Sequence, residues 1–380
     1  MTTKPTYIFH SNKKLRCGHT TGTCAAAASK AAAQMILTKK EIHNVQILTP
    51  KGILLDLPIE DISISDTEVT CAVRKDGGDD IDATHDALIY STVTESDSGI
   101  TIDGGEGVGR VTRKGLDQPV GNAAINRVPR SMITEALKDV AESLGYTGGF
   151  DVKISIPEGG SIAKRTFNPR LGIVGGISVL GTSGIVEPMS ETALIETIKV
   201  EMRMRYEAGE RTILVVPGNY GKDFADELPG LDGDKAVKCS NFVGEMLDYA
   251  CELGLDVVLI SNLGKLVKVA GGIMNTHSRN ADSRMEILAA NAAMAGGSLE
   301  LVKGIMGCIS TDDALELIDT EGLIPEVSRL LLDKVGFHMN HRTGGKIRTS
   351  AVMFSAVYGL LGYTEGAKGM LKEIDEKVMI

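Results

Sequence analysis

The chain has no tryptophan, and aromatic residues make up only 4% of its 380 residues. Aromatic stacking is therefore excluded as the main means of ligand recognition, and the core must consist of aliphatic side chains, methionine and alanine. The net charge of −10 argues against nucleic acid or an anionic membrane surface as a partner. No run of about 18 apolar residues occurs, so no membrane-spanning helix is expected.

The chain also lacks a CxxC pair. Its six cysteines are scattered, which favours reduced thiols over a disulfide framework: Cys17, Cys24, Cys71, Cys239, Cys251 and Cys308. The first residues contain no apolar h-region, so no signal peptide is expected and we predict a cytoplasmic protein. Hydrophobic residues at 43% and charged residues at 24% are typical of a globular protein, and the length allows two domains.

Residues 1–160 predict an α+β domain with antiparallel strands. The alanine-rich segment Cys24–Leu37 favours a helix, and Ser131–Gly145 has the apolar spacing of an amphipathic helix. Short runs of apolar residues between turn residues predict strands at Val45–Leu48, Ile53–Leu57, Glu68–Val73 and Asp151–Ile156.

Residues 161–380 predict a Rossmann-like α/β domain with a parallel sheet and trailing helices, so we expect the domain boundary between residues 160 and 161. Strands and helices alternate through Ile177–Leu180, Glu191–Glu207, Thr212–Val216, Asn241–Leu253 and Val257–Ile260. Helical patterns then dominate from Asp282 to Met379.

Three loops of small residues, 181–184, 217–221 and 261–265, follow the predicted strands of this domain. In a parallel sheet such loops gather at the carboxyl ends of the strands. Their convergence predicts a site for a nucleotide-like ligand, although each loop alone could be an ordinary βα turn.

The threonine cluster before the alanine-rich helix has two interpretations. Thr20, Thr21, Thr23 and the free N–H groups of the helix start could bind an anionic group. Alternatively, the segment is a capped helix of small residues that packs closely against a sheet.

Residues 75–86 contain five aspartates and one histidine, His85. Metal binding is one interpretation, although the spacing does not match an EF-hand loop. A solvated turn is the second, and a proton acceptor at His85 or one aspartate is the third.

The glycine-rich segment Gly99–Thr112 resembles the first loop of S-adenosylmethionine and dinucleotide sites. The residues after its glycines predict a returning strand, however, whereas the fingerprint requires a helix. We therefore expect a glycine-rich hairpin.

Two basic clusters stand out in this acidic chain. Residues 110–130 contain five basic residues against the single acid Asp117, and residues 161–186 contain three basic residues and no acid. They are either solvated surface or a pocket for a ligand with several carboxylates, which arginine pairs in bidentate fashion. The basic residues are Arg110, Arg113, Lys114, Arg127, Arg130, Lys164, Arg165 and Arg170.

Five long motifs then occur in order: LRCGHTTGTCAAAASKAA, VRKDGGDDIDATHDA, DGGEGVGRVTRKGL, PVGNAAINRVPRSMI and AKRTFNPRLGIVGGISVLGTSGIVEPMS. On these motifs the chain resembles the cobalt-precorrin-5B C1-methyltransferases of anaerobic cobalamin (vitamin B12) biosynthesis. The resemblance implies transfer of a methyl group from S-adenosylmethionine to C1 of cobalt-precorrin-5B, a cobalt tetrapyrrole, which gives cobalt-precorrin-6A.

The resemblance gives the candidate residues their roles, because the tetrapyrrole carries acetate and propionate groups. We predict substrate contacts at Thr20, Thr21, Thr23, Arg110, Arg127, Arg130, Lys164, Arg165 and Arg170. We predict donor contacts in the small-residue loops at Gly175, Gly176, Gly181, Thr182, Gly184, Gly218, Asn219, Ser261 and Asn262. Asp79, Asp80 and His85 are the candidates to orient the ring or accept a proton. We expect no protein-bound metal, and catalysis largely by positioning.

Two other functions compete with this one. An NAD(P)-linked tetrapyrrole reductase would need a glycine fingerprint that opens a helix, which residues 105–109 lack. A non-catalytic carrier of a cobalt tetrapyrrole would bind no methyl donor, and His85 and His277 are the possible axial contacts to cobalt. Transient contact with neighbouring pathway enzymes and a homo-oligomer are also compatible with the sequence.

Overall fold

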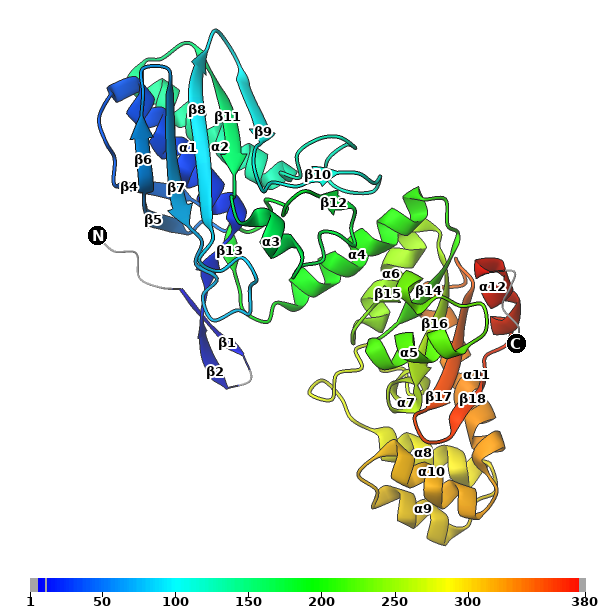
Figure 1. The fold of residues 1–380 in the computed structure, drawn as a ribbon. Coiled ribbons are helices and arrows are strands. Elements are labelled where there is room, and N and C mark those ends of the chain that lie inside the picture. The colour runs from blue at the N-terminus through cyan, green and yellow to red at the C-terminus, as the bar shows by residue number, and fades with distance from the viewer. Residues whose placement is uncertain (1–5, 11, 376–380) are drawn as a thin grey trace. The chain divides into compact units, whose positions relative to one another are not determined.

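The computed structural model describes residues 6–10 and 12–375. The chain forms two compact units, unit 1 over Met1–Glu191 and unit 2 over Thr192–Ile380 (Figure 1). The predicted boundary between residues 160 and 161 lies earlier than this division. Residues 177–186 belong to unit 1 because they hydrogen-bond to its first long helix and its third strand.

Unit 1 is built on a five-stranded sheet in the order β6-β7-β8-β11-β9. Strands β6, β7, β8 and β11 pair antiparallel, whereas β9 pairs parallel to β11. The sequence predicts β7 and β11 but not β6 or β8. The strand bounds are Glu60–Ile64 for β6, Glu68–Arg74 for β7, Leu88–Ser96 for β8, Ile100–Gly104 for β9 and Gly149–Ser155 for β11.

Helix α1, Thr21–Thr38, packs against β7 and β8, and helix α2, Arg127–Leu144, packs against α1. The alanines of α1 are buried, which lets the backbone approach its neighbours closely. A Cβ atom at Gly22 would lie 2.6 Å from the Pro129 ring, so α1 and α2 cross with no room for a side chain. The hairpin of β4, Asn44–Leu48, and β5, Leu54–Pro58, also contacts α1.

The predicted hairpin over residues 99–112 is wrong. Strand β10, Arg110–Val111, pairs with β12, Ile173–Val174, and not with β9. The β10–β12 pair brings the two basic segments of the sequence side by side. The remaining elements of unit 1 are β1 Tyr7–His10, β2 Lys13–Arg16, β3 Gly18–His19, α3 Gly159–Ala163 and β13 Ile185–Val186.

Unit 2 contains a five-stranded sheet in the order β15-β14-β16-β17-β18. The first four strands are parallel and β18 is antiparallel. The bounds are Thr212–Val216 for β14, Val237–Lys238 for β15, Asp256–Asn262 for β16, Thr349–Ser355 for β17 and Gly359–Tyr363 for β18.

The strands of unit 2 are apolar on both faces, which is typical of a parallel sheet between two helical layers. Val215 and Leu259 face one core together with helices α6, α7 and α11, and their neighbours Leu214 and Val258 face the other core with α5 and α12. The helices are α4 Glu191–Glu207, α5 Asn219–Glu227, α6 Val243–Leu253, α7 Leu263–Ala270, α8 Arg284–Met294, α9 Leu299–Met306, α10 Thr311–Thr320, α11 Ile324–Thr343 and α12 Ala367–Ile374, with a 3-10 turn at Gly233–Lys235.

One prediction about this part of the chain is wrong. Residues 177–180 are not a strand of the parallel sheet, because Ile177 and Val179 form bridges to Val108 and Ile125 within unit 1. Helices dominate after Asp282, as the sequence predicts, although the region also contains β17 and β18, and its last residues, 376–380, lie outside the described residues. Among the helices of the described chain, none is long and apolar enough for a membrane span.

Candidate functional site

The aspartate-rich segment 75–86 is largely engaged in contacts within unit 1. Arg16 donates through its guanidinium to both carboxylate oxygens of Asp76, and this hydrogen bond lowers the Asp76 pKa to about 2 although burial opposes the shift. Asp79 accepts the Arg16 backbone N–H at 2.6 Å, and the buried Lys75 pairs with Asp82 at 2.6 Å. Within residues 6–10 and 12–375, no three His, Cys, Asp or Glu side chains are placed to hold a metal ion.

His85 has a hydrogen-bond partner within its own loop. Its Nδ1 accepts the backbone N–H of Gly77 at 2.9 Å, so the neutral ring carries its proton on Nε2. The Nε2 atom lies 3.6 Å from Asp86 Oδ2. We therefore assign His85 a role in holding this loop, whereas Asp79 and Asp80 each keep one carboxylate oxygen without a hydrogen bond to the described chain.

The predicted threonine cluster also has internal partners. Thr21 Oγ1 donates to the Leu180 carbonyl at 3.1 Å, Thr23 Oγ1 donates to the Gly184 carbonyl at 2.7 Å, and Thr20 caps α1 by accepting the Thr23 N–H at 3.2 Å. All three threonines are buried. The geometry favours the second interpretation of this segment, a capped helix that packs closely against its neighbours.

The glycines of residues 175–184 belong to the same packing. A Cβ atom at Gly176 would lie 2.0 Å from the Gly107 carbonyl oxygen, and one at Gly184 would lie 2.8 Å from Thr49 Cβ. Gly181 packs equally closely on Thr20. The fold of unit 1 therefore requires glycine at positions 176, 181 and 184, whereas no atom lies within 4 Å of a Cβ atom built at Gly175. The predicted donor residues Gly175, Gly176, Gly181, Thr182 and Gly184 belong to unit 1, so they are not loops of the parallel sheet of unit 2.

The two basic clusters meet across the β10–β12 pair. Thr112 Oγ1 donates to the Gly172 carbonyl at 2.6 Å, and Arg113 reaches the Arg170 carbonyl at 3.4 Å. Phe167 and Val174 on the same segment are 57% and 58% exposed. We use the term mixed face for the exposed apolar and basic side chains of these segments: Arg113, Lys114, Arg127, Lys164, Arg165, Phe167 and Val174.

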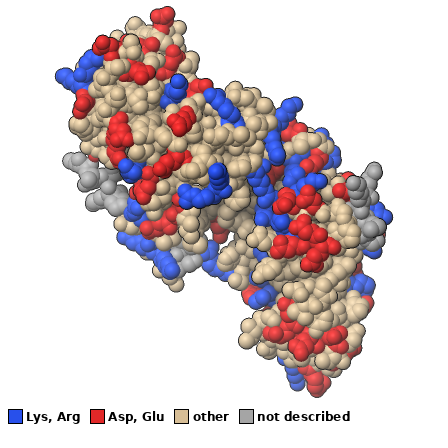
Figure 2. Space-filling view, viewed as in Figure 1, with Lys and Arg blue, Asp and Glu red and all other residues tan. Residues whose placement is uncertain are grey.

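Two predicted substrate residues near the mixed face have internal partners. Arg110 pairs with both carboxylate oxygens of Asp103, at 2.7 and 2.9 Å. Arg130 donates to the carbonyls of Ile125 and Ile102, both at 2.8 Å. By contrast, the basic residues of the mixed face form no ion pair within the described chain. Figure 2 shows that basic and acidic side chains are interspersed over the molecular face in view.

Four predicted donor residues do lie together in unit 2. Gly218 and Asn219 follow β14, and Ser261 and Asn262 end the neighbouring strand β16. Because both strands run in the same direction, these residues share the carboxyl edge of the sheet. Ser261 is 1% exposed, whereas Asn262 caps α7 by accepting the Lys265 N–H at 3.3 Å.

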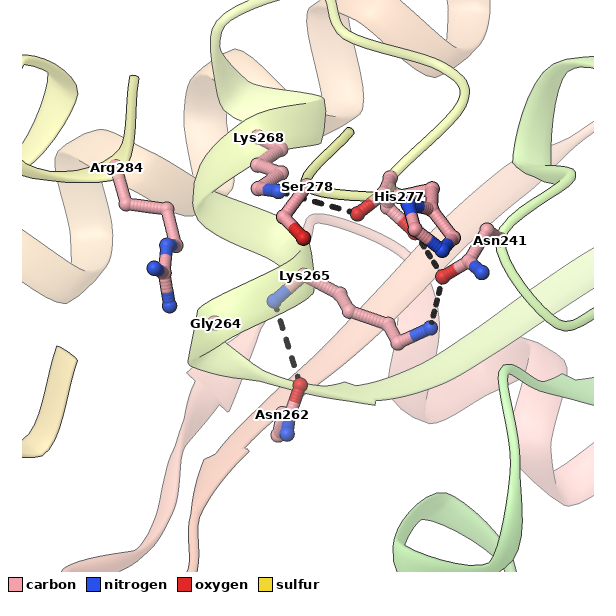
Figure 3. A pocket seen from close by; sticks show the side chains of 9 residues that line it. Asn241, Asn262, Gly264, Lys265, Lys268, His277, Ser278 and Arg284 are labelled. Atoms are coloured by element: carbon pink, nitrogen blue, oxygen red, sulfur yellow. Dashed lines mark hydrogen bonds between the residues drawn. The ribbon is translucent and has the colours of Figure 1, made fainter. Parts of the chain in front are cut away.

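A pocket of about 390 Å³ opens beside this edge, at the start of α7 (Figure 3). Lys265 and Lys268 both project from α7 toward it. Lys265 Nζ donates to Asn241 Oδ1 at 2.6 Å, and Lys268 Nζ donates to the carbonyls of Thr276 and Ala281 at 3.2 and 3.0 Å. The lining residues are Asn241, Asn262, Gly264, Lys265, Lys268, Thr276, His277, Ser278 and Arg284.

Burial has the largest effect on the pKa values of the two lysines in this pocket. It lowers the pKa of Lys265 and of Lys268, and in each case a neighbouring cation acts in the same direction. Arg284 is held by Asp282 through two hydrogen bonds of 2.8 and 2.9 Å. His277, one of the two possible axial contacts to cobalt, is an exposed residue at the rim, where its Nδ1 accepts the Arg279 N–H at 3.1 Å.

Sequence reasoning missed most of this pocket. Asn241 follows the two-residue strand β15, which is too short to leave a periodic signal, and Lys268 resembles any lysine of an amphipathic helix. It also missed Asp312 of α10, whose carboxylate accepts the Ser355 hydroxyl at 2.8 Å where β17 ends.

Two family models and a solved structure are similar to this chain. The profile of the family described as CbiD matches residues 8–188, and the one described as "CbiD, C-terminal domain" matches residues 275–365. A solved structure of a cobalamin biosynthesis protein (CbiD) from Archaeoglobus fulgidus is 27% identical, with a TM-score of 0.39, over 73% of this chain and 87% of that one.

Two relatives cover almost the whole chain. The cobalt-precorrin-5B C(1)-methyltransferase of Ruminiclostridium cellulolyticum is 50% identical over 374 residues, which is 97% of each chain. The protein of that name from Alkaliphilus metalliredigens is 48% identical over 370 residues, again 97% of each. On this evidence the chain belongs to the CbiD family, whose curated relatives bear the name cobalt-precorrin-5B C(1)-methyltransferase.

Proposed function

We propose that the chain transfers a methyl group from S-adenosylmethionine to C1 of cobalt-precorrin-5B, which yields cobalt-precorrin-6A. The observation that carries this proposal is the 50% identity over 97% of the chain with a relative of that name. The donor supplies a methyl group on a sulfonium, whose thioether leaves without needing a proton. We infer that the residues of the chain act by binding and orienting the two reactants, since holding them in the right geometry lowers the barrier.

We propose that unit 2 holds the donor at the carboxyl edge of its sheet, as a Rossmann-like domain does. Gly218, Asn219, Ser261 and Asn262 are the residues that support this placement. Loops 217–221 and 261–265 contain no acidic residue for ribose hydroxyls. Asp312, beside Ser355 at the end of β17, offers such a carboxylate at the same edge.

We propose that the mixed face of unit 1 binds the macrocycle. Its exposed Phe167 and Val174 suit the flat apolar face of a tetrapyrrole, and its unpaired basic side chains suit the peripheral carboxylates. The proposal keeps the predicted role of substrate contact for Arg127, Lys164 and Arg165. Arg170 lies on the same segment as Lys164 and Arg165. Asp79 and Asp80 remain candidates to orient the ring. A homo-oligomer, contact with pathway enzymes and the absence of a resident metal remain predictions.

The proposal is tested by anaerobic incubation of the protein with cobalt-precorrin-5B and S-adenosylmethionine, followed by mass spectrometry. We expect the tetrapyrrole to gain one methyl group and S-adenosylhomocysteine to accumulate over many turnovers. A carrier would bind the tetrapyrrole without consuming the donor. Asn262→Ala, which removes a side chain at the proposed donor edge, should raise the KM for the donor.

A further inference from the structure

The pocket at the start of α7 has an unusual charge for this chain. Its lining contains three cationic residues, Lys265, Lys268 and Arg284, and no acid, although the whole chain has a net charge of −10. Asp282, outside the lining, pairs with Arg284. Within the described chain, neither lysine forms an ion pair.

The ammonium group of each lysine has one donor without an acceptor among the described residues. A lysine ammonium has three donors. Lys265 Nζ uses two of them on neutral oxygens, Asn241 Oδ1 at 2.6 Å and the Ser240 carbonyl at 3.3 Å. Lys268 uses two on backbone carbonyls, and the residue is only 3% exposed. Each ammonium therefore retains one donor, and in Figure 3 both side chains project from α7 toward the same space.

The start of α7 adds to the positive potential. The first N–H groups of a helix have no partner within the helix and carry partial positive charge. Gly264, in the first turn, lines the pocket and exposes its backbone to it. A buried cation without an anion is costly, so a bound anion would stabilise this arrangement.

We propose that this pocket is a carboxylate-binding site, in which Lys265 contacts the carboxylate directly and Lys268 supplies a second, buried positive charge. The inference rests on the proposed function for its choice of anion, because the donor and the tetrapyrrole both carry carboxylates. The same cations repel a sulfonium, so the reacting sulfur of the donor lies outside the pocket. The carboxylate is either that of the donor's amino acid part or a side chain of the tetrapyrrole.

The test compares the wild-type chain with Lys265→Gln, which removes the charge but can still donate a hydrogen bond to Asn241. Calorimetry measures the Kd of S-adenosylhomocysteine and of its decarboxylated analogue, and steady-state kinetics gives the KM for cobalt-precorrin-5B. Lys303→Gln is the matched control, because Lys303 is an exposed lysine of unit 2 outside the pocket.

Two results support the proposal and identify the source of the carboxylate. If the carboxylate belongs to the donor, Lys265→Gln weakens S-adenosylhomocysteine binding by about tenfold. The wild-type chain then binds the decarboxylated analogue equally weakly, and the substitution does not weaken it further. If the carboxylate belongs to the tetrapyrrole, the Kd of S-adenosylhomocysteine is unchanged and the KM for cobalt-precorrin-5B rises by about tenfold.

The proposal is overturned if both constants stay within twofold of the wild-type values in a Lys265→Gln protein with an unchanged melting temperature. It is equally overturned if Lys303→Gln causes the same loss. Should Lys265→Gln fail to fold, Lys265→Arg tests the site, because the retained charge predicts retained binding. Failure of the proposed function would give a different result, because the wild-type chain would then transfer no methyl group. Calorimetry with S-adenosylhomocysteine and its decarboxylated analogue would still test the pocket.

Discussion

Gly181 lies directly against Thr20, because a Cβ atom at residue 181 would lie 2.2 Å from Thr20 Oγ1. The backbone of Gly181 also has a φ of +142°, which side chains rarely adopt. The contact joins residues 180–184 to the first turn of α1. It explains the small residues of both segments by close packing within unit 1.

Replacing Gly181 with alanine should destabilise unit 1 by at least about 2 kcal/mol, since both the close contact and the positive φ oppose a side chain. Gly175→Ala is the matched control. Gly175 also has a positive φ, +86°, but no atom lies within 4 Å of its Cβ position, so strain alone should cost about 1 kcal/mol. Urea unfolding measures both values. Equal stabilities of the two variants would contradict the packing argument.

The Arg16–Asp76 pair should make the fold sensitive to acid. The pKa of Asp76 is about 2 in the folded chain against an ordinary value of 3.8, so the carboxylate stabilises the fold above about pH 4. This contribution should disappear as the pH falls from about 4 to about 2. Urea midpoints of the wild type and of Asp76→Asn should therefore differ at neutral pH and converge near pH 2. Asp139→Asn, an exposed carboxylate of α2, should show no such convergence.

Arg127 and Arg130 should respond differently to substitution with methionine. Arg130 donates to two backbone carbonyls, so Arg130→Met should destabilise unit 1 by about 1–3 kcal/mol. Arg127 is exposed on the mixed face, so Arg127→Met should leave stability unchanged and raise the KM for cobalt-precorrin-5B several-fold. Unfolding and steady-state kinetics on both variants separate the two roles. A normal KM for Arg127→Met would remove Arg127 from the mixed-face proposal.

The carboxylate site should weaken at alkaline pH. Burial lowers the Lys265 pKa, and nearby Lys268 acts in the same direction although Cys239 opposes it. Lys265 should therefore lose its charge at a lower pH than an ordinary lysine, and carboxylate affinity should fall as its ammonium deprotonates. Calorimetric Kd values across the alkaline range test this for the ligand identified by Lys265→Gln. In Lys265→Arg, affinity should persist to higher pH, because arginine stays charged. Identical profiles would contradict the role of Lys265.

Much of the secondary structure was predictable because it follows hydrophobic periodicity. The alanine-rich helix α1, the amphipathic helix α2 and the apolar strands β14 and β16 all have strong local signals. The assignment of residues 177–180 failed because an apolar run does not reveal its pairing partner. Val179 bridges Ile125 in unit 1, a contact between residues distant in the sequence.

The site was harder to predict than the fold. A charged side chain in a sequence does not reveal whether its partner lies inside the protein. Arg110 and Arg127 look alike in sequence, yet Arg110 pairs with Asp103 whereas Arg127 is exposed. The aspartates of residues 75–86 suggested metal binding or proton transfer. In the structure, several of them form hydrogen bonds that hold a loop. The lysines of α7 gave no such signal because their arrangement depends on residues 240–241 and 276–281.

The central claim, methyl transfer to C1, is tested most directly with S-adenosylmethionine that carries a ¹³C-labelled methyl group. After anaerobic incubation with cobalt-precorrin-5B, carbon NMR locates the label in the product. The account predicts one labelled methyl group on C1 and one S-adenosylhomocysteine for each product molecule. Tight binding of the tetrapyrrole with no label transferred, or a label on another carbon, would contradict it.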